Sequence, residues 1–302
     1  MNHEKTLIVI AGATASGKTA ISVQLAKYYN TVIISADSRQ FYREMSIGTA
    51  KPADEDLTTV NHYFINSHSI TENFTVGDFE RECLALLDEL FKQHDKVILV
   101  GGSGLYIKAV CEGFDRLPAA DAAIRNRLNF ELTEHGLTRL QERLKLADPV
   151  YHGSVDLNNP QRIIRALEVF EATGEPFSSY HRSLKNERPF KIIKIGLNWP
   201  RDILYARINQ RVDMMVQQGL VDEARSLLPY RHLNALNTVG YTELFDYFDG
   251  KSDLDTAISL IKQNTRRFAK RQLTWFKKDK NMTWCEASAA NLSGNLIEAI
   301  TY

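Results

Sequence analysis

The stretch Leu7-Ile-Val-Ile-Ala-Gly-Ala-Thr-Ala-Ser-Gly-Lys-Thr19 decides the fold of this 302-residue chain. Its first five residues form an apolar run typical of a buried strand, and the helical pattern Ala20-Ile-Ser-Val-Gln-Leu-Ala26 follows it. Between them stands the spacing G-x-x-x-x-G-K-[ST], in which backbone N–H groups and a helix N-terminus surround phosphate oxygens. Lys18 adds a positive charge, and the Thr19 hydroxyl can bind Mg²⁺. The stretch therefore predicts a phosphate site at the end of a strand.

The overall composition is that of an ordinary globular protein. Lys and Arg together number 37, as do Asp and Glu, so the net charge is zero and any nucleic-acid partner must be held by local clusters. The three cysteines are widely separated and form no C-x-x-C pair, which argues against a zinc site or a disulfide framework. The sequence shows no signal-peptide pattern and no apolar run of membrane-spanning length. We therefore expect a cytoplasmic protein with no membrane partner.

Short runs rich in Ile and Val recur along the chain and predict strands at residues 7–11, 31–35, 96–100 and 191–197. Helical patterns separate the first three, which favours a parallel sheet with helices on both faces. Between residues 115 and 188 the strands stop and apolar residues recur at helical spacing. The predicted fold class is α/β, a P-loop parallel-sheet core (residues 1–114 and 189–302) with an inserted helical domain (residues 115–188). After Trp199-Pro200 the chain is expected to be helical.

The segments that follow the second and third expected strands carry candidate catalytic residues. Asp37 follows the second strand, and the carboxyl ends of parallel strands face the ligand crevice. A helix N-cap is the alternative role for Asp37. The third strand runs into Gly101-Gly-Ser-Gly-Leu-Tyr106 instead of the acidic residue usual in P-loop nucleotide hydrolases. Glycines let the backbone approach a ligand, and Ser103 can donate a hydrogen bond to a leaving oxygen.

Three further basic features are candidate anion-binding groups. Lys51, in the loop Ile47-Gly-Thr-Ala-Lys-Pro52, could reach an anion. Two arginine pairs have helical spacing, so that both members of a pair lie on one helix face: Arg162 with Arg165, and Arg207 with Arg211. Such a face is usually a solvated one without a ligand. The run Arg266-Arg-Phe-Ala-Lys-Arg-Gln-Leu-Thr-Trp-Phe-Lys-Lys278 mixes basic and aromatic residues. That run fits either a contact with a phosphate backbone or a core helix with a solvated basic side.

Seven motifs resemble those of the tRNA dimethylallyltransferases and occur in the same order, over nearly the whole chain. They are Gly12-Ala-Thr-Ala-Ser-Gly-Lys-Thr19, Asp37-Ser-Arg-Gln-Phe-Tyr42, Gly48-Thr-Ala-Lys-Pro52, Gly101-Gly-Ser-Gly-Leu-Tyr106, Gln161-Arg-Ile-Ile-Arg-Ala-Leu-Glu168, Val239-Gly-Tyr241 and residues 265–276. The resemblance implies that a dimethylallyl group moves from its diphosphate to N6 of the adenosine just 3′ of the anticodon, releasing diphosphate. It also implies a bacterial-type enzyme, because the zinc-finger tail of eukaryotic members is absent.

The resemblance implies a role for each matched residue. Lys18 and Arg211 would neutralise the diphosphate, Ser103 would donate toward its bridging oxygen, and Asp37 would accept the proton from N6. Thr19 would help to place Mg²⁺, the expected cofactor. The diphosphate-binding residues would be Gly12, Ala13, Thr14, Ala15, Ser16, Gly17, Lys18 and Thr19.

The expected partners are dimethylallyl diphosphate and the anticodon stem-loop of tRNA, with the enzyme acting as a monomer. The adenine must leave its stack to react, so we expect the enzyme to flip it. Gln40, Arg162 and Arg165 are the candidates for holding the flipped nucleotide. The full set of tRNA-binding candidates is Asp37, Ser38, Arg39, Gln40, Ser103, Arg125, Gln161, Arg162, Ile163, Ile164 and Arg165.

The sequence departs from the family pattern at three places. The family commonly has Pro at Ala13 and Thr at Ser103, substitutions that keep the backbone role and the hydroxyl. It usually has Pro-Asn-Asp near Leu157-Asn-Asn-Pro160, so tRNA contacts there are not carried over.

Three other functions compete with the tRNA-modifying one. A small-molecule P-loop kinase would share the loop and Asp37, but would not need the helical insertion or the basic C-terminal helix. An adenylate isopentenyltransferase would not need a surface that grips tRNA. A non-catalytic nucleotide switch would be expected to carry an N-K-x-D motif, which is absent.

Overall fold

The computed structural model describes residues 4–113, 118, 121–180, 187–287 and 292–301. The chain divides into two compact units: unit 1 comprises Met1–Glu112 and Glu187–Tyr302, and unit 2 comprises Gly113–Asn186. The expected boundary between residues 114 and 115 falls outside the described residues.

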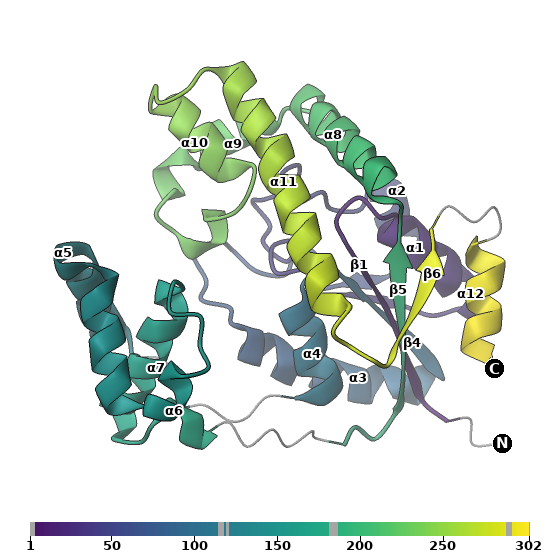
Figure 1. The fold of residues 1–302 in the computed structure, drawn as a ribbon. Coiled ribbons are helices and arrows are strands. Elements are labelled where there is room, and N and C mark those ends of the chain that lie inside the picture. Colours follow the sequence, from purple (N-terminus) through teal and green to yellow (C-terminus); the bar gives the residue numbers. More distant parts are fainter. Residues whose placement is uncertain (1–3, 114–117, 119–120, 181–186, 288–291, 302) are drawn as a thin grey trace. The chain divides into compact units, whose positions relative to one another are not determined.

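Unit 1 is built on a six-stranded sheet with the order β3-β2-β4-β1-β5-β6 (Figure 1). Every pair of neighbouring strands is parallel, so the predicted α/β class with a parallel-sheet core is confirmed. The strands are β1 (Thr6–Gly12), β2 (Ile33–Ser35), β3 (His62–Tyr63), β4 (Lys96–Gly101), β5 (Lys191–Asn198) and β6 (Met282–Glu286).

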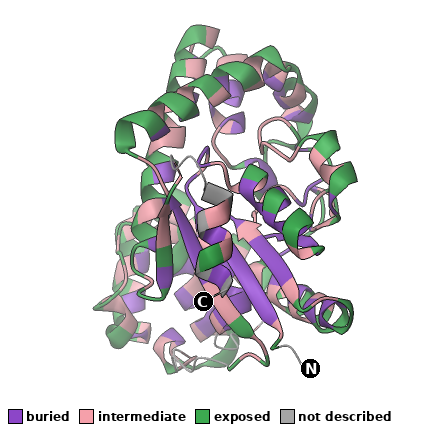
Figure 2. Ribbon diagram, turned by 90° about the vertical axis from the view of Figure 1, so that its right-hand side faces the viewer, coloured by how far each residue is buried: buried purple, intermediate pink, exposed green. Residues whose placement is uncertain are grey.

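Helices pack on both faces of this sheet. Alternate residues of a strand point to opposite faces, and in β1 Leu7 and Val9 enter one apolar cluster while Ile8 and Ile10 enter another. Figure 2 shows the resulting buried sheet among helices whose outer faces are exposed. The helices of unit 1 are α1 (Lys18–Tyr29), α2 (Asp54–Thr59), α3 (Val76–Gln93), α4 (Gly104–Glu112), α8 (Arg201–Gln217), α9 (Leu220–Leu227), α10 (Tyr241–Phe248), α11 (Leu254–Phe276) and α12 (Leu292–Thr301), with 3₁₀ turns η2 (Leu228–Tyr230) and η3 (Asn234–Leu236).

Two strands were missed by the sequence patterns. The expectation that the chain after Trp199-Pro200 is helical is wrong at β6, which pairs with β5 from Lys194 and Met282 onward. β6 has the mixed sequence Met-Thr-Trp-Cys-Glu and is an edge strand, so it lacks the continuous apolar run of a central parallel strand. β3 has only two residues, too few to produce a pattern.

Two of the three cysteines lie in the core of unit 1. Cys83 and Cys111 are buried free thiols in the core, and burial raises the pKa of Cys111 to about 12, which keeps it protonated. None of the helices in the described part of the chain is both long enough and apolar enough to cross a membrane.

Unit 2 is helical, and its elements are α5 (Ala122–Ala147), α6 (Pro149–His152), α7 (Pro160–Thr173) and the 3₁₀ turn η1 (Phe177–Tyr180). Gly136, with a φ of 76° and a ψ of 177°, breaks α5 into two helical segments. The side chain of Asn159 accepts a hydrogen bond from the Arg162 N–H and so caps α7, which begins with Pro160. Apolar residues of α5 and α7, including Leu140 and Leu167, form the core of this unit.

Candidate active site

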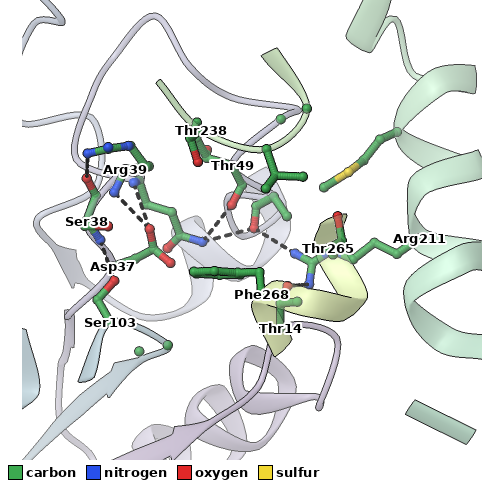
Figure 3. Close-up of a pocket in the computed structure, with 18 of the residues that line it drawn as sticks. Thr14, Asp37, Ser38, Arg39, Thr49, Ser103, Arg211, Thr238, Thr265 and Phe268 are labelled. Carbon is green, nitrogen blue, oxygen red and sulfur yellow. Dashed lines mark hydrogen bonds between the residues drawn. The ribbon is translucent and has the colours of Figure 1, made fainter. Parts of the chain in front are cut away.

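A cavity of about 560 Å³ is lined by residues that follow β1, β2 and β4, together with residues of α8 and α11 (Figure 3). All its lining residues belong to unit 1. The segments that follow the parallel strands bring to it the predicted residues Thr14, Lys18, Thr19, Asp37, Ser38, Arg39, Gln40 and Ser103, and α8 adds Arg211.

The P-loop, residues 12–19, connects β1 to α1. Side chains from α8 and from the segment before it donate hydrogen bonds to the loop. Ala15 and Gly17 have φ angles of 62° and 89°, the left-handed geometry that turns the loop. Arg207 Nε donates to the Ala15 carbonyl at 2.9 Å, and Trp199 Nε1 donates to the Ser16 carbonyl at 3.0 Å. These two carbonyls therefore have side-chain donors from outside the loop, and Arg207 belongs to the loop scaffold.

Lys18 and Arg211 are two of the cations that line the cavity. Lys18 Nζ donates to the Ala13 carbonyl at 2.7 Å, and Arg211 lies 3.4 Å from both Thr14 Oγ1 and the Ala50 carbonyl. Among the described residues, neither cation forms an ion pair. Burial and the charge of Arg211 lower the pKa of Lys18 to about 7, with Asp37 opposing the shift. Desolvated cations without a counterion are unfavourable, which favours an anionic ligand here.

We expect the affinity for inorganic diphosphate to fall as pH rises above about 7, where ligand-free Lys18 loses its proton. A bound diphosphate raises the pKa of Lys18, so binding at pH 8.5 should take up about one proton, and binding at pH 6 should take up none at this group. Calorimetry in buffers of different ionisation enthalpy measures this uptake. Lys18→Arg, which stays charged, is the control and should show no uptake at pH 8.5. Equal uptake in the two proteins would assign the proton to another group.

Asp37 lies in a turn that leaves one carboxylate oxygen available. Its Oδ1 accepts hydrogen bonds from the N–H groups of Arg39 at 2.9 Å and Gln40 at 3.3 Å. Its Oδ2 has no hydrogen-bond partner within the described ranges. No helix begins after Asp37, so the N-cap alternative is wrong, and the second oxygen is free to accept a proton from a ligand.

Ser103 follows β4 and lies beside the turn that carries Asp37 (Figure 3). Its Oγ accepts a hydrogen bond from the Ser38 N–H at 3.0 Å. A serine hydroxyl has one hydrogen to donate, and this contact uses only its acceptor capacity. The Ser103 hydrogen therefore remains available to a ligand oxygen.

Gln40 and Lys51 are engaged by protein atoms, which corrects their expected roles. Gln40 Nε2 donates to the carbonyls of Thr49 and Ala50 at 3.2 and 3.1 Å, and its Oε1 accepts from Ser35 Oγ at 3.1 Å. Lys51 Nζ donates to the Tyr42 carbonyl at 2.6 Å. The oxygen and the nitrogen of the Gln40 amide are thus both bonded to protein atoms, and the nitrogen holds the loop at residues 47–52. The prediction that this side chain holds a flipped nucleotide therefore has to be revised.

Glu223 of α9 holds the same loop and was missed by sequence reasoning. Its carboxylate accepts hydrogen bonds from the N–H groups of Ser46, Ile47 and Gly48 at 2.8 to 2.9 Å, and from the Tyr241 hydroxyl at 2.7 Å. A glutamate on an ordinary amphipathic helix carries no sequence signal for this role. The contact joins residues more than 170 positions apart and is created by the tertiary fold.

The tRNA-binding candidates of unit 2 are mostly engaged within that unit. Arg125 and Arg165 both pair with the fully buried carboxylate of Glu168, at 2.7 and 3.2 Å. Ile163 and Ile164 are 0% and 1% exposed, so the prediction that they contact tRNA has to be corrected. Their side chains fill the core of unit 2, because the apolar face of α7 is the face that packs on α5.

Among these candidates on α7, Gln161 and Arg162 remain exposed. Arg162 makes no ion pair in the described part of the chain. It is therefore the one arginine of the expected pair that is free to bind a phosphate.

α11 carries a different kind of basic surface. Ala269, Gln272 and Phe276 face the core, which confirms that one side of the helix is buried. Residues 266–278 include six basic side chains, and none of them forms an ion pair within the described ranges. They are Arg266, Arg267, Lys270, Arg271, Lys277 and Lys278. Phe268 and Arg271 line the cavity, so the unpaired charge extends to its mouth.

The sequence pattern of the IPP transferase family matches residues 40–279. The chain belongs to this family. It is 55% identical to the tRNA dimethylallyltransferase of Christiangramia forsetii over 93% of both chains, and 52% identical to that of Cytophaga hutchinsonii over 98% of this chain and 97% of the relative. The resemblance seen in the seven motifs is thereby confirmed.

Solved structures of the family have the same fold. The tRNA isopentenylpyrophosphate transferase of Bacillus halodurans is 39% identical, with a TM-score of 0.71 over 98% of this chain and 94% of that one. A eukaryotic dimethylallyltransferase captured acting on tRNA is 25% identical, with a TM-score of 0.80 over 97% of this chain and 78% of that one.

Proposed function

We propose that the cavity transfers a dimethylallyl group from dimethylallyl diphosphate to N6 of the adenosine 3′ of the tRNA anticodon, releasing diphosphate. Family membership supports the reaction class. One observation of the site carries the assignment: the P-loop shares a single cavity with the carboxylate of Asp37, which has a free oxygen, and the hydroxyl of Ser103, which has a free hydrogen. In addition, strand β4 ends at this cavity and is followed by Gly102 and Ser103, not by an acidic residue.

The leaving diphosphate is the charge that this site stabilises. Lys18 and Arg211 line the cavity and form no ion pair with any residue that the structure describes, so their charge is available to phosphate oxygens. The hydroxyl of Ser103 donates toward the oxygen that bridges the diphosphate to the allylic carbon. Fixed donors and charges of this kind stabilise the negative charge that develops as the carbon–oxygen bond breaks.

Asp37 is the general base for the attacking amine. Its Oδ1 is held by two backbone N–H groups, so Oδ2 has a defined position from which to accept the N6 proton. The target adenine reaches this oxygen only when flipped out of the anticodon-loop stack, as other base-modifying enzymes require.

The residues present fit a magnesium ion that is shared with the substrate. Thr19, Ser35 and Asp37 contribute hard oxygen atoms to the cavity wall, and Mg²⁺ is usually held by one or two protein oxygens together with phosphate oxygens. No cluster of three or more His, Cys, Asp or Glu side chains occurs among the described residues, so a cage made by the protein alone is not the arrangement proposed. Thr19 would hold the ion, which would add positive charge at the diphosphate.

The unpaired cations of α11 are proposed as the main contacts with the tRNA backbone. Their charge is not neutralised by neighbouring carboxylates, whereas Arg125 and Arg165 of unit 2 already share Glu168. Phosphate contacts dominate the affinity of most nucleic-acid complexes. Within unit 2, Arg162 is proposed as a separate phosphate contact.

Arg162→Ala should flatten the slope of log K against log[salt] for tRNA binding by about 0.7 to 0.9, the counterions released by one phosphate contact. Arg165→Ala should leave the slope nearly unchanged and lower the thermal stability of unit 2, because Arg165 pairs with the buried Glu168. A filter-binding salt titration of both variants, with thermal unfolding, tests this. A slope reduced only in Arg165→Ala would reverse the assignment.

The function is tested by incubating the protein with labelled dimethylallyl diphosphate and either unmodified tRNA or AMP. Label in tRNA alone is expected. Label in AMP would support the adenylate isopentenyltransferase alternative, which family membership does not favour. Calorimetric titration with ATP in Mg²⁺ covers the kinase alternative, which tighter binding and turnover of ATP would support.

A further inference from the structure

Gln272 of α11 connects the two loops that carry the reacting groups. Its Oε1 accepts a hydrogen bond from the Thr14 N–H of the P-loop at 2.9 Å, and its Nε2 donates to the Gly102 carbonyl at 2.9 Å. The side chain is 7% exposed. A single planar amide therefore links the diphosphate loop to the residue directly before Ser103.

The turn at residues 101–104 is shaped to receive this helix. A Cβ on Gly102 would come within 2.3 Å of Gln272 Nε2, and a Cβ on Gly104 would come within 2.2 Å of the Trp275 ring. Gln272 and Trp275 are three residues apart and lie on one face of α11. Ser103 is thus flanked by two glycines that are each covered by a side chain of α11.

Ser103 itself is contacted by the turn that carries Asp37. The Ser38 N–H donates to Ser103 Oγ at 3.0 Å, which orients the hydroxyl. Gln272 holds the backbone on the other side of the same residue. Only glutamine or asparagine offers both a neutral donor and a neutral acceptor from one amide, and both backbone groups would lose their partner without it.

We propose that Gln272 is a positioning residue for prenyl transfer: it holds Ser103 at a fixed distance from the P-loop, so that the hydroxyl meets the bridging oxygen of the bound diphosphate. This inference rests on the proposed function of Ser103. Gln272 lines the same cavity, but both ends of its amide are bonded to backbone groups of the protein, so its proposed effect is exerted through Ser103 and the P-loop. Misplacement by about 1 Å can lower a rate about 10²-fold, which sets the size of the expected effect.

Gln272→Met keeps the length of the side chain and removes both hydrogen bonds. We expect the single-turnover rate constant at saturating substrates to fall about 10- to 100-fold. The affinity for tRNA should not change, because the side chain is buried beneath the exposed basic surface of α11. Thr274→Val is the matched control, since Thr274 is exposed on the same helix and its hydroxyl bonds only the Lys270 carbonyl.

A double-mutant cycle with Ser103→Ala separates positioning from a general loss of structure. Gln272→Met should lower the rate about 10- to 100-fold when Ser103 is present but less than about threefold when it is Ala, because there is no hydroxyl left to position. Equal factors in both backgrounds would overturn the inference. A wild-type rate for Ser103→Ala alone would instead overturn the proposed role of Ser103, and the inference with it.

Thermal unfolding and tRNA binding show whether each variant is folded. If Gln272→Met does not fold, Gln272→Asn takes its place in the cycle, because it keeps the amide but is one methylene too short to reach both loops. The same non-additivity with Ser103→Ala is expected. Full activity of a folded Gln272→Asn or Gln272→Met would contradict the proposal.

Discussion

Asp37→Asn is expected to lower the rate constant for prenyl transfer about 10²- to 10⁴-fold, the usual contribution of a general base. The substitution keeps the atom Oδ1, which accepts hydrogen bonds from the N–H groups of Arg39 and Gln40. It replaces only the free Oδ2 with an NH₂ group that cannot accept a proton. The turn should therefore survive while the base is lost.

The measurement for Asp37→Asn is single-turnover transfer from labelled dimethylallyl diphosphate to unmodified tRNA. Thermal unfolding and diphosphate affinity serve as controls and should stay close to wild type. Asp37→Ala provides a matched comparison, because it removes the turn contacts as well and should also lower stability. An Asp37→Asn variant that unfolds early but keeps its rate would mean that Asp37 has only a structural role.

Arg211→Met is expected to lower the rate constant about 10²- to 10³-fold, as the loss of one preorganised group at a developing charge usually does. The structure adds a second expectation. Burial lowers the pKa of Arg211, and the charge of Asp37 opposes this shift only in part. The hydrogen-bond partners of Arg211 are neutral oxygens at 3.4 Å, and no ion pair within the described part of the chain compensates its desolvated charge. A methionine, which replaces the apolar stem of the arginine and omits the charged group, should therefore leave the ligand-free protein as stable as wild type or more stable.

The two readouts for Arg211→Met are the transfer rate and the thermal midpoint without ligand. Affinity for tRNA is the control and should be unchanged. Arg211 belongs to α8 and lines the cavity, and it is not one of the basic side chains proposed to contact the tRNA backbone. Arg207→Met is the comparison variant: Arg207 donates to the Ala15 carbonyl of the P-loop, so its loss should lower stability. A destabilised Arg211→Met with normal turnover would show that Arg211 is structural.

Local sequence was sufficient for the parts of the site that lie on the sheet. The P-loop, Asp37 and Ser103 each follow a strand, and the carboxyl ends of parallel strands necessarily meet at one edge. Each motif is recognised from residues that are neighbours along the chain. The fold class and the meeting of these three groups at one cavity could therefore be predicted.

The same local reasoning failed where the direction of a side chain depends on packing. Ile163 and Ile164 belong to a motif, yet the apolar face of α7 turns them into the core of unit 2. Gln40 also belongs to a motif, but its amide is used by the carbonyls of Thr49 and Ala50. A motif names a residue without showing which of its atoms already has a partner.

Sequence by itself determined the parallel sheet, the P-loop and the candidate catalytic groups at the strand ends, because these arise from short-range periodicity and turn geometry. Only the tertiary structure decided how the loops are held. Gln272 meets Thr14 across 258 positions of sequence, and Glu223 meets Gly48 across 175. The physical reason is that a buried backbone N–H or carbonyl must find a partner wherever packing places one, and that partner is chosen by distance in space.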